Sequence, residues 1–183
     1  MHARINLPTF DDLTPEGQSV HRAILETRGS MNGPFAAWLL SPELADRAQR
    51  LGLHCRYGTG FAKHESELLI LIAAAHFRCT TEWQVHSAIA IEAGLSAETL
   101  ESLRTGAALV FSERRNQVLF DFASAILKTN RVPDAQFAAA IEELGSIQTM
   151  ELVGILGYYS MAAMTLNAFD MRLSNDAKSA FPD

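Results

Sequence analysis

Apolar residues recur along most of the chain with the spacing of amphipathic helices, and no alternation of apolar and polar residues is long enough for a strand. Thr14-Pro15-Glu16 and Ser41-Pro42-Glu43 each combine an N-cap residue with a proline at the first helical position. The pattern predicts an all-α protein of about seven or eight helices, plus a short helical segment at 35–40. The expected helices are 15–27, 42–56, 63–77, 80–93, 96–106, 112–128, 133–145 and 147–171, with a turn at 29–34 and a loop at 57–61.

Two of these helices carry unusually long apolar runs. Leu68–Ala75 is apolar all round, so the helix that contains it must be covered on every side. Leu152–Phe169 lacks formal charges over 18 residues, the lower limit for a membrane span. It also contains Tyr158 and Tyr159, and no basic cluster beside it fixes an orientation. A buried core helix or a subunit-interface helix explains it better, and we expect no membrane partner.

Length and composition indicate one domain over residues 1–183, 48% hydrophobic and 20% charged. The net charge is −6 and the basic residues form no stripe, so nucleic acid is not an expected partner. A small acidic substrate is not excluded. Residues 1–13 lack the features of a secretion signal, and Cys55 and Cys79 lie too far apart in sequence to suggest a disulfide framework. A reducing cytoplasm fits this cysteine usage best.

The helix predicted at 80–93 carries the most informative pair of polar residues. With Glu82 placed at zero, His86 falls at about 40° and Ala90 at about 80°, whereas Gln84 falls at about 200° on the opposite side. Glu82 and His86 therefore lie on the apolar face, one turn apart. Their burial is costly unless they meet, and a carboxyl beside an imidazole can exchange a proton near neutral pH. The alternative is a structural hydrogen bond that fixes the helix orientation.

Other polar and aromatic residues give weaker signals. Cys79 falls beside the pair if the helix is extended back, and a helix N-terminus would lower its thiol pKa, yet lone cysteines near a core usually behave as small apolar residues. His and Glu are metal ligands, but neither HExxH nor paired ExxH motifs occur, so we expect no metal and no cofactor. Tyr158, Tyr159 and Asn167, and the aromatic residues Phe35, Trp38 and Trp83, either pack in the core or wall a cavity.

Three segments, within residues 63–96, resemble the carboxymuconolactone decarboxylase family. They are Lys63-His64-Glu65-Ser66-Glu67 with the apolar run after it, Cys79-Thr80-Thr81-Glu82-Trp83-Gln84-Val85-His86, and Glu92-Ala93-Gly94-Leu95-Ser96. Weaker similarity extends outward over most of the chain. The resemblance implies a single helical domain of the alkyl hydroperoxidase D-like (AhpD-like) type, which assembles as trimers or hexamers with active sites near subunit contacts.

The resemblance implies two chemistries. One is decarboxylation of a carboxylated muconolactone in aromatic breakdown. The other is alkyl hydroperoxide reduction by a Cys-x-x-Cys pair, a downstream His and an upstream Glu, which map to Cys79, His86 and Glu67. Glu82 stands where the second cysteine would be, so this chain resembles a Glu-Trp-x-x-His subgroup without the cysteine pair, and the usual disulfide cycle cannot run.

We therefore predict catalytic residues Glu67, Glu82 and His86, with Cys79 as a further candidate. The first hypothesis is a decarboxylase-type lyase that acts on a small carboxylated lactone by general acid–base chemistry. The second is thiol-dependent peroxide reduction through Cys79 alone. The third is a non-catalytic oligomeric protein that binds a small ligand.

Overall fold

A helix buried on nearly every side forms the centre of the computed structural model, which describes residues 1–174 and 178–181. Every residue from Glu65 to Ala74 in α4 (Lys63–His76) is buried, as the apolar run predicts. Three helices surround it, α5 (Thr80–Glu92), α7 (Arg114–Thr129) and α8 (Asp134–Ala168), and α6 (Ala97–Thr105) also packs on it. The all-α prediction is confirmed, because the described part of the chain contains only one isolated β-bridge, His2 to Arg172.

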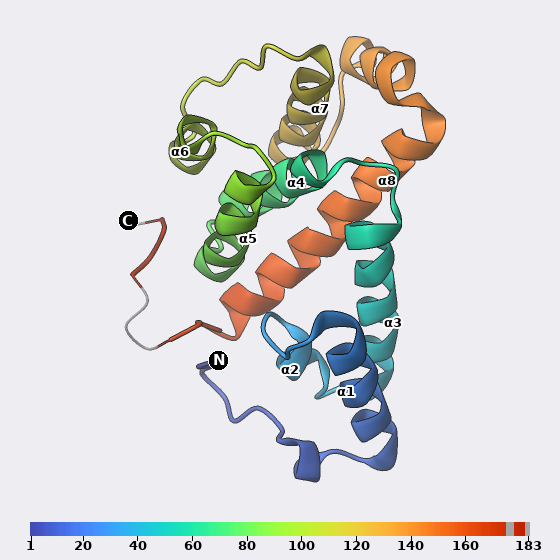
Figure 1. Cartoon of the computed structure of the whole chain (residues 1–183), viewed down its shortest axis with the longest axis vertical. Coiled ribbons are helices and arrows are strands. Elements are labelled where there is room, and N and C mark those ends of the chain that lie inside the picture. The colour runs from blue at the N-terminus through green and yellow to red at the C-terminus, as the bar shows by residue number, and fades with distance from the viewer. Residues whose placement is uncertain (175–177, 182–183) are drawn as a thin grey trace.

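The N-terminal helices form the other part of the molecule. They are the short 3₁₀ helix η1 (Phe10–Asp12), α1 (Pro15–Arg28), α2 (Phe35–Trp38), α3 (Pro42–Leu53) and the π-helix η2 (His54–Gly58). Figure 1 shows α8 crossing the molecule diagonally, with α1–α3 on one side and α4–α7 on the other. Side chains of α8 can therefore face both parts of the structure, and this position brings α1, η2 and α5 around one site.

Helix α8 is interrupted where the sequence places a stop. Gly145 has φ 72° and ψ 170°, a non-helical conformation that favours glycine. Arg115 crosses to this point, because its guanidinium donates to the Glu143 carbonyl and to the Gln148 side chain, and it also pairs with the buried carboxylate of Glu65. The expected boundary between helices 133–145 and 147–171 is confirmed as a kink within one continuous element.

Other predicted boundaries were wrong by a few residues. The helix expected to reach Arg56 leaves α geometry after Leu53, and the π-helix continues to Gly58, so the loop predicted at 57–61 begins later. The cap of α7 is Glu113 instead of Ser112. The last helix ends at Ala168 and not at Met171, because Asp170 takes a left-handed conformation and Met171 N–H donates back to the Leu166 carbonyl.

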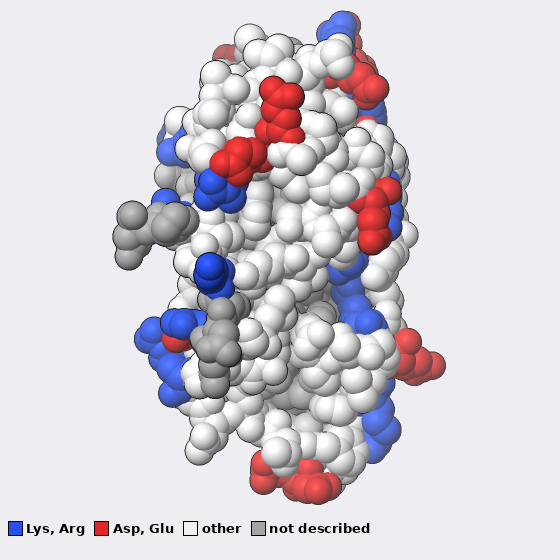
Figure 2. Space-filling model, turned by 60° about the vertical axis from the view of Figure 1, so that its left-hand side comes forward, with Lys and Arg blue, Asp and Glu red and all other residues white. Residues whose placement is uncertain are grey.

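The surface carries dispersed charge. On the face drawn in Figure 2, acidic and basic side chains are scattered over a largely uncharged surface without an extended basic patch. Among the residues that the structure describes, no helix has both the length and the hydropathy that crossing a membrane requires. One face of the apolar run of α8 lies in the core, where Leu152, Ile155 and Leu156 are buried, whereas Val153 and Met164 on its other side are exposed.

Candidate active site

His86 lies between two carboxyl groups, one from each of two packed helices. Its Nδ1 is 2.6 Å from Oε2 of Glu67 on α4, and both side chains are only 4% exposed. An ionised Glu67 can only accept a hydrogen bond, so Nδ1 then carries the proton and Nε2 faces the other way. On that side, Nε2 is 3.3 Å from Oε2 of Glu82, one helical turn away. The inward orientation predicted for Glu82 and His86 is present, and the structure brings Glu67 to them.

Glu82 is the least satisfied member of this trio. Its Oε2 atom is buried, and the contact of this oxygen with Nε2 of His86 is not aligned as a hydrogen bond. No described residue therefore donates a hydrogen bond to Oε2 of Glu82. Burial raises the pKa of Glu82 above its usual value, the Glu67 charge adds to this effect, and His86 and Arg56 oppose it. Glu82 therefore keeps a proton at a higher pH than a solvent-exposed glutamate, and Nε2 of His86 lies close enough to exchange it.

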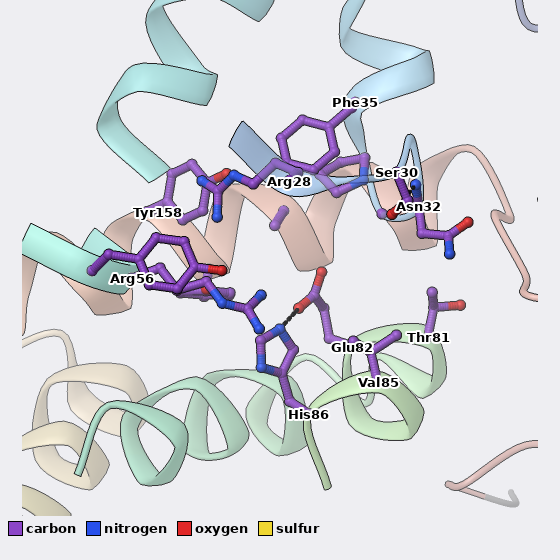
Figure 3. Close-up of a pocket in the computed structure, with 15 residues that line it drawn as sticks. Arg28, Ser30, Asn32, Phe35, Arg56, Thr81, Glu82, Val85, His86 and Tyr158 are labelled. Atoms are coloured by element: carbon purple, nitrogen blue, oxygen red, sulfur yellow. Dashed lines mark hydrogen bonds and ion pairs between the residues drawn. The ribbon is translucent and has the colours of Figure 1, made fainter. Parts of the chain in front are cut away.

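Both groups line a cavity of about 240 Å³. Its walls come from the end of α1, the turn before α2, the π-helix η2, the first turns of α5 and the middle of α8 (Figure 3). Glu67 is not part of the lining and lies behind His86 on α4. The lining residues are Arg28, Ser30, Asn32, Gly33, Pro34, Phe35, Arg56, Tyr57, Thr81, Glu82, Val85, His86, Tyr158, Tyr159 and Ala162.

Aromatic rings of α8 hold the imidazole and form one wall. Tyr159 meets His86 edge to face, with ring centroids 5.3 Å apart, and Tyr158 meets Tyr159 in the same way at 5.1 Å. Tyr158 also lies directly against α3, since a Cβ added to Gly52 would be 2.1 Å from the tyrosine hydroxyl oxygen. Glycine at position 52 therefore permits this wall, and both tyrosines line the cavity as the sequence suggested.

Two arginines that sequence reasoning missed also line the cavity. Arg28 is in the last turn of α1, and Arg56 is in η2. A basic residue near a helix C-terminus commonly offsets the helix dipole, so neither position stands out in the sequence. The available signal was that each arginine lies at the predicted end of a long helix, 15–27 or 42–56, but only the fold shows that both ends reach the same cavity.

Cys79 does not join this constellation. It is the N-cap of α5 and almost fully buried, yet it does not line the cavity. Burial raises its pKa to about 12, and the nearby Glu82 charge contributes. The predicted lowering of this pKa by the helix N-terminus was therefore wrong, because desolvation of the thiolate outweighs it. Cys55 is also buried, and burial raises its pKa to about 11.

The remaining candidates divide between core and cavity. Phe35 lines the cavity, whereas Trp38 and Trp83 are buried outside its lining. The Asn167 side chain donates to the Phe77 carbonyl and so ties α8 to the end of α4. Within residues 1–174 and 178–181, no cluster of three or more His, Cys, Asp or Glu side chains has the arrangement of a metal site.

Comparison with protein families assigns the central part of the chain. Residues 42–125, which contain α3 to most of α7, match the model of the Carboxymuconolactone decarboxylase family. This segment includes Glu67, Glu82 and His86, the three residues brought together at the site. No curated protein matches the chain significantly in sequence.

Several solved structures share the fold at low sequence identity. A peroxidase-related protein from Silicibacter sp. is 17% identical, with a TM-score of 0.76 over 95% of this chain and 93% of that one. A peroxidase-related protein with an alkylhydroperoxidase AhpD core from Ralstonia eutropha is 16% identical, with a TM-score of 0.75 over 96% and 95%. A cysteine-to-alanine variant of the debrominase Bmp8, in complex with 2,3,4-tribromopyrrole, is 13% identical, with a TM-score of 0.73 over 96% and 94%. The fold is AhpD-like, as the resemblance implied.

The raised pKa of Glu82 predicts a specific dependence of stability on pH. The folded protein binds the Glu82 proton more tightly than the unfolded chain does. The resulting contribution to the free energy of unfolding is therefore full below about pH 4 and is lost as pH rises through the raised pKa. Glu82→Gln cannot ionise, and it should become more stable relative to wild type as pH rises from about 4 through the raised pKa of Glu82, by roughly 1.4 kcal/mol for each unit of the pKa rise. Urea unfolding at a series of pH values measures this difference.

Glu101→Gln is the matched control for this experiment. The exposed Glu101 carboxylate accepts hydrogen bonds from Arg104, which lower its pKa. Any small change in the stability of this variant relative to wild type, as pH rises, should therefore have the opposite sign. If the free energies of unfolding of wild type and Glu82→Gln differed by a constant amount over the whole pH range, Glu82 would ionise as freely in the folded protein as in the unfolded chain.

Proposed function

We propose that this protein belongs to the carboxymuconolactone decarboxylase and AhpD-like family and is a decarboxylase-type lyase for a small carboxylated lactone or a related product of aromatic breakdown. The observation that carries the proposal is His86 at the cavity wall, with Nδ1 hydrogen-bonded to Glu67 and Nε2 3.3 Å from a carboxyl oxygen of the buried Glu82. This arrangement suits delivery of a proton to a carbon atom, the step that completes a decarboxylation.

The reaction would proceed in two steps whose atoms and charges balance. First, the bond between the substrate carboxylate and the ring carbon breaks, CO₂ leaves, and the electron pair passes into the adjacent unsaturated lactone as an enolate. Second, Glu82 passes its proton to Nε2 of His86, and Nε2 gives that proton to the ring carbon. Solvent then reprotonates Glu82. Overall, one proton is consumed and one CO₂ is released.

Positive charge near the reacting groups supports this chemistry. Arg56 lines the cavity beside His86 and Glu82 (Figure 3), and it can stabilise the enolate oxygen that develops as CO₂ leaves. The tyrosine wall of Tyr158 and Tyr159 keeps part of the cavity dry, and a dry site favours the loss of a carboxylate charge as neutral CO₂. Glu67 acts through His86 and is a positioning residue, since it lies outside the cavity lining.

The rival chemistry is thiol-dependent peroxide reduction, and it has support from the names of two structures with this fold. In this chain it would require Cys79 as a thiolate. The burial of Cys79, a pKa raised to about 12 and its place outside the cavity lining all disfavour that role. We therefore rank it second.

Substitutions at the site should separate these possibilities. With carboxymuconolactone and a panel of small carboxylated lactones as probes, His86→Ala should lower kcat about 10²- to 10⁴-fold, because the proton donor is lost. Glu67→Gln should lower kcat less and shift the pH profile of kcat, while Cys79→Ser should keep wild-type activity. CO₂ release and loss of the lactone absorbance measure turnover.

Each rival predicts a different result. Peroxide reduction that disappears in Cys79→Ser would support the thiol reaction and reject the lyase. If wild type turns over none of the probes, while Glu82→Gln and His86→Ala change only the melting temperature, a non-catalytic binding protein is the better account.

We also propose that copies of the chain associate through an exposed apolar surface at the start of the second part of α8. Ile147 is 75% exposed and Met150 is 64% exposed, and with Leu51 they line a shallow groove of about 440 Å³ between α3 and α8. Adjacent exposed apolar side chains of this size are typical of interaction surfaces. The resemblance implies that the assembly is a trimer or a hexamer.

Light scattering after gel filtration tests this assembly. Ile147→Glu and Met150→Glu should each shift wild type toward the monomer mass, because a charge would be buried at the contact. Val110→Glu is the control, since Val110 is 84% exposed on the loop between α6 and α7 and outside that groove. A wild-type monomer, or equal shifts in all three variants, would contradict this use of the surface.

A further inference from the structure

The cavity contains more positive charge than its own acidic groups balance. Arg28 and Arg56 both line it; the Glu67 and Glu82 carboxyl groups act on Arg56, whereas no described residue accepts a hydrogen bond from the buried Nε and Nη2 of Arg28. The one carboxyl in the lining is Glu82, which burial holds toward its neutral form. An uncompensated charge of this kind is costly to keep in a partly buried position. The imbalance favours an anion as the occupant of the cavity.

Arg28 is the less compensated of the two arginines. Its Nε and Nη2 atoms are buried and have no hydrogen-bond partner. These two N–H groups form one edge of the guanidinium, and other arginines in this chain use the same edge for carboxylates. Arg104 donates from Nε and Nη2 to both oxygens of Glu101, and Arg172 does the same to Asp170. Arg28 therefore has an unused edge of the kind that binds a carboxylate in a bidentate manner.

Aromatic rings hold this guanidinium in place. Its Cζ atom is 5.6 Å from the centre of the Phe35 ring and 5.5 Å from the centre of the Tyr57 ring. These rings lie beside the carboxyl-binding edge and offer flat apolar surfaces to the body of a ligand. In Figure 3, Arg28 lies near Tyr158 and Phe35, whereas Arg56 lies near His86 and Glu82. The two arginines thus serve different ends of the cavity.

We propose that Arg28 is a substrate-recognition residue, which binds a carboxylate on a small planar unsaturated acid at the end of the cavity away from His86. The group it binds is one that the reaction leaves in place. The cavity volume of about 240 Å³ equals that of about eight water molecules, which suits a single ring with one or two substituents. Because Nε and Nη2 of Arg28 are buried, binding a carboxylate at this edge requires the guanidinium to turn toward the cavity. The identity of the bound acid as a substrate rests on the proposed function, but its binding does not.

Binding without turnover tests this assignment independently of the reaction. Titration calorimetry of the full chain with benzoate and with the neutral analogue benzamide should show preference for benzoate. Arg28→Met should weaken benzoate binding roughly ten- to hundredfold and leave benzamide binding unchanged, the loss expected for a bidentate charged hydrogen bond.

Arg22→Met is the matched control on the same helix. Arg22 is exposed and stacks on Phe10, 5.5 Å from the ring centre, and it does not line the cavity. Arg28→Lys keeps the positive charge but lacks the two parallel N–H groups of the guanidinium, and it should bind benzoate with intermediate affinity. If Arg28→Met and Arg22→Met, both folded by circular dichroism, bind benzoate equally well, the proposal is wrong. It is also wrong if only Arg56→Met loses binding, since the anion would then lie at the other arginine.

Discussion

The structure depends on one costly feature, an imidazole and two carboxyl groups enclosed by apolar helices. His86, Glu67 and Glu82 are all nearly inaccessible to solvent. Each would destabilise the core if it were left alone, because charged or polar groups lose their hydration there. The close packing of α4 against α5 resolves most of this cost, since it places Glu67 within hydrogen-bonding distance of His86. One oxygen of Glu82 has no hydrogen-bond partner, and Glu82 lines the cavity. The unfavourable desolvation of its carboxylate therefore raises its pKa at the place where a ligand would bind.

The elements around this trio then have distinct physical tasks. α4 is buried among its neighbours and carries Glu67, and the low dielectric of these surroundings strengthens the interaction of Glu67 with His86. α8 supplies a wall of tyrosines that orients the imidazole, and Gly52 lets that wall lie close to α3. The π-helix η2 follows α3 and carries Arg56 to the cavity; such wide turns are often found at functional sites. Positive charge, a proton donor and a dry wall therefore meet in a small volume.

Much of this could be predicted from the sequence, for definite reasons. Helix periodicity placed Glu82 and His86 on the apolar face, the unbroken run in α4 required a central position, and Gly145 marked the kink in α8. Glu67 was found only through the family resemblance, because its partner lies 19 residues away on another helix. Arg28 and Arg56 were missed for the same reason: no local pattern records which helix ends converge. The direction of the Cys79 pKa shift was predicted wrongly because its helix position was visible in the sequence, whereas its depth in the core was not.

The most direct test of the central arrangement is nuclear magnetic resonance of the protein with ¹⁵N-labelled histidine. We expect one Nδ1–H signal that exchanges slowly with water, disappears in His86→Ala and moves in Glu67→Gln, while Glu82→Gln shifts the Nε2 resonance of the same ring. If His86 instead showed rapid proton exchange, and neither glutamine substitution altered its nitrogen resonances, the imidazole would not be held between the two carboxyl groups.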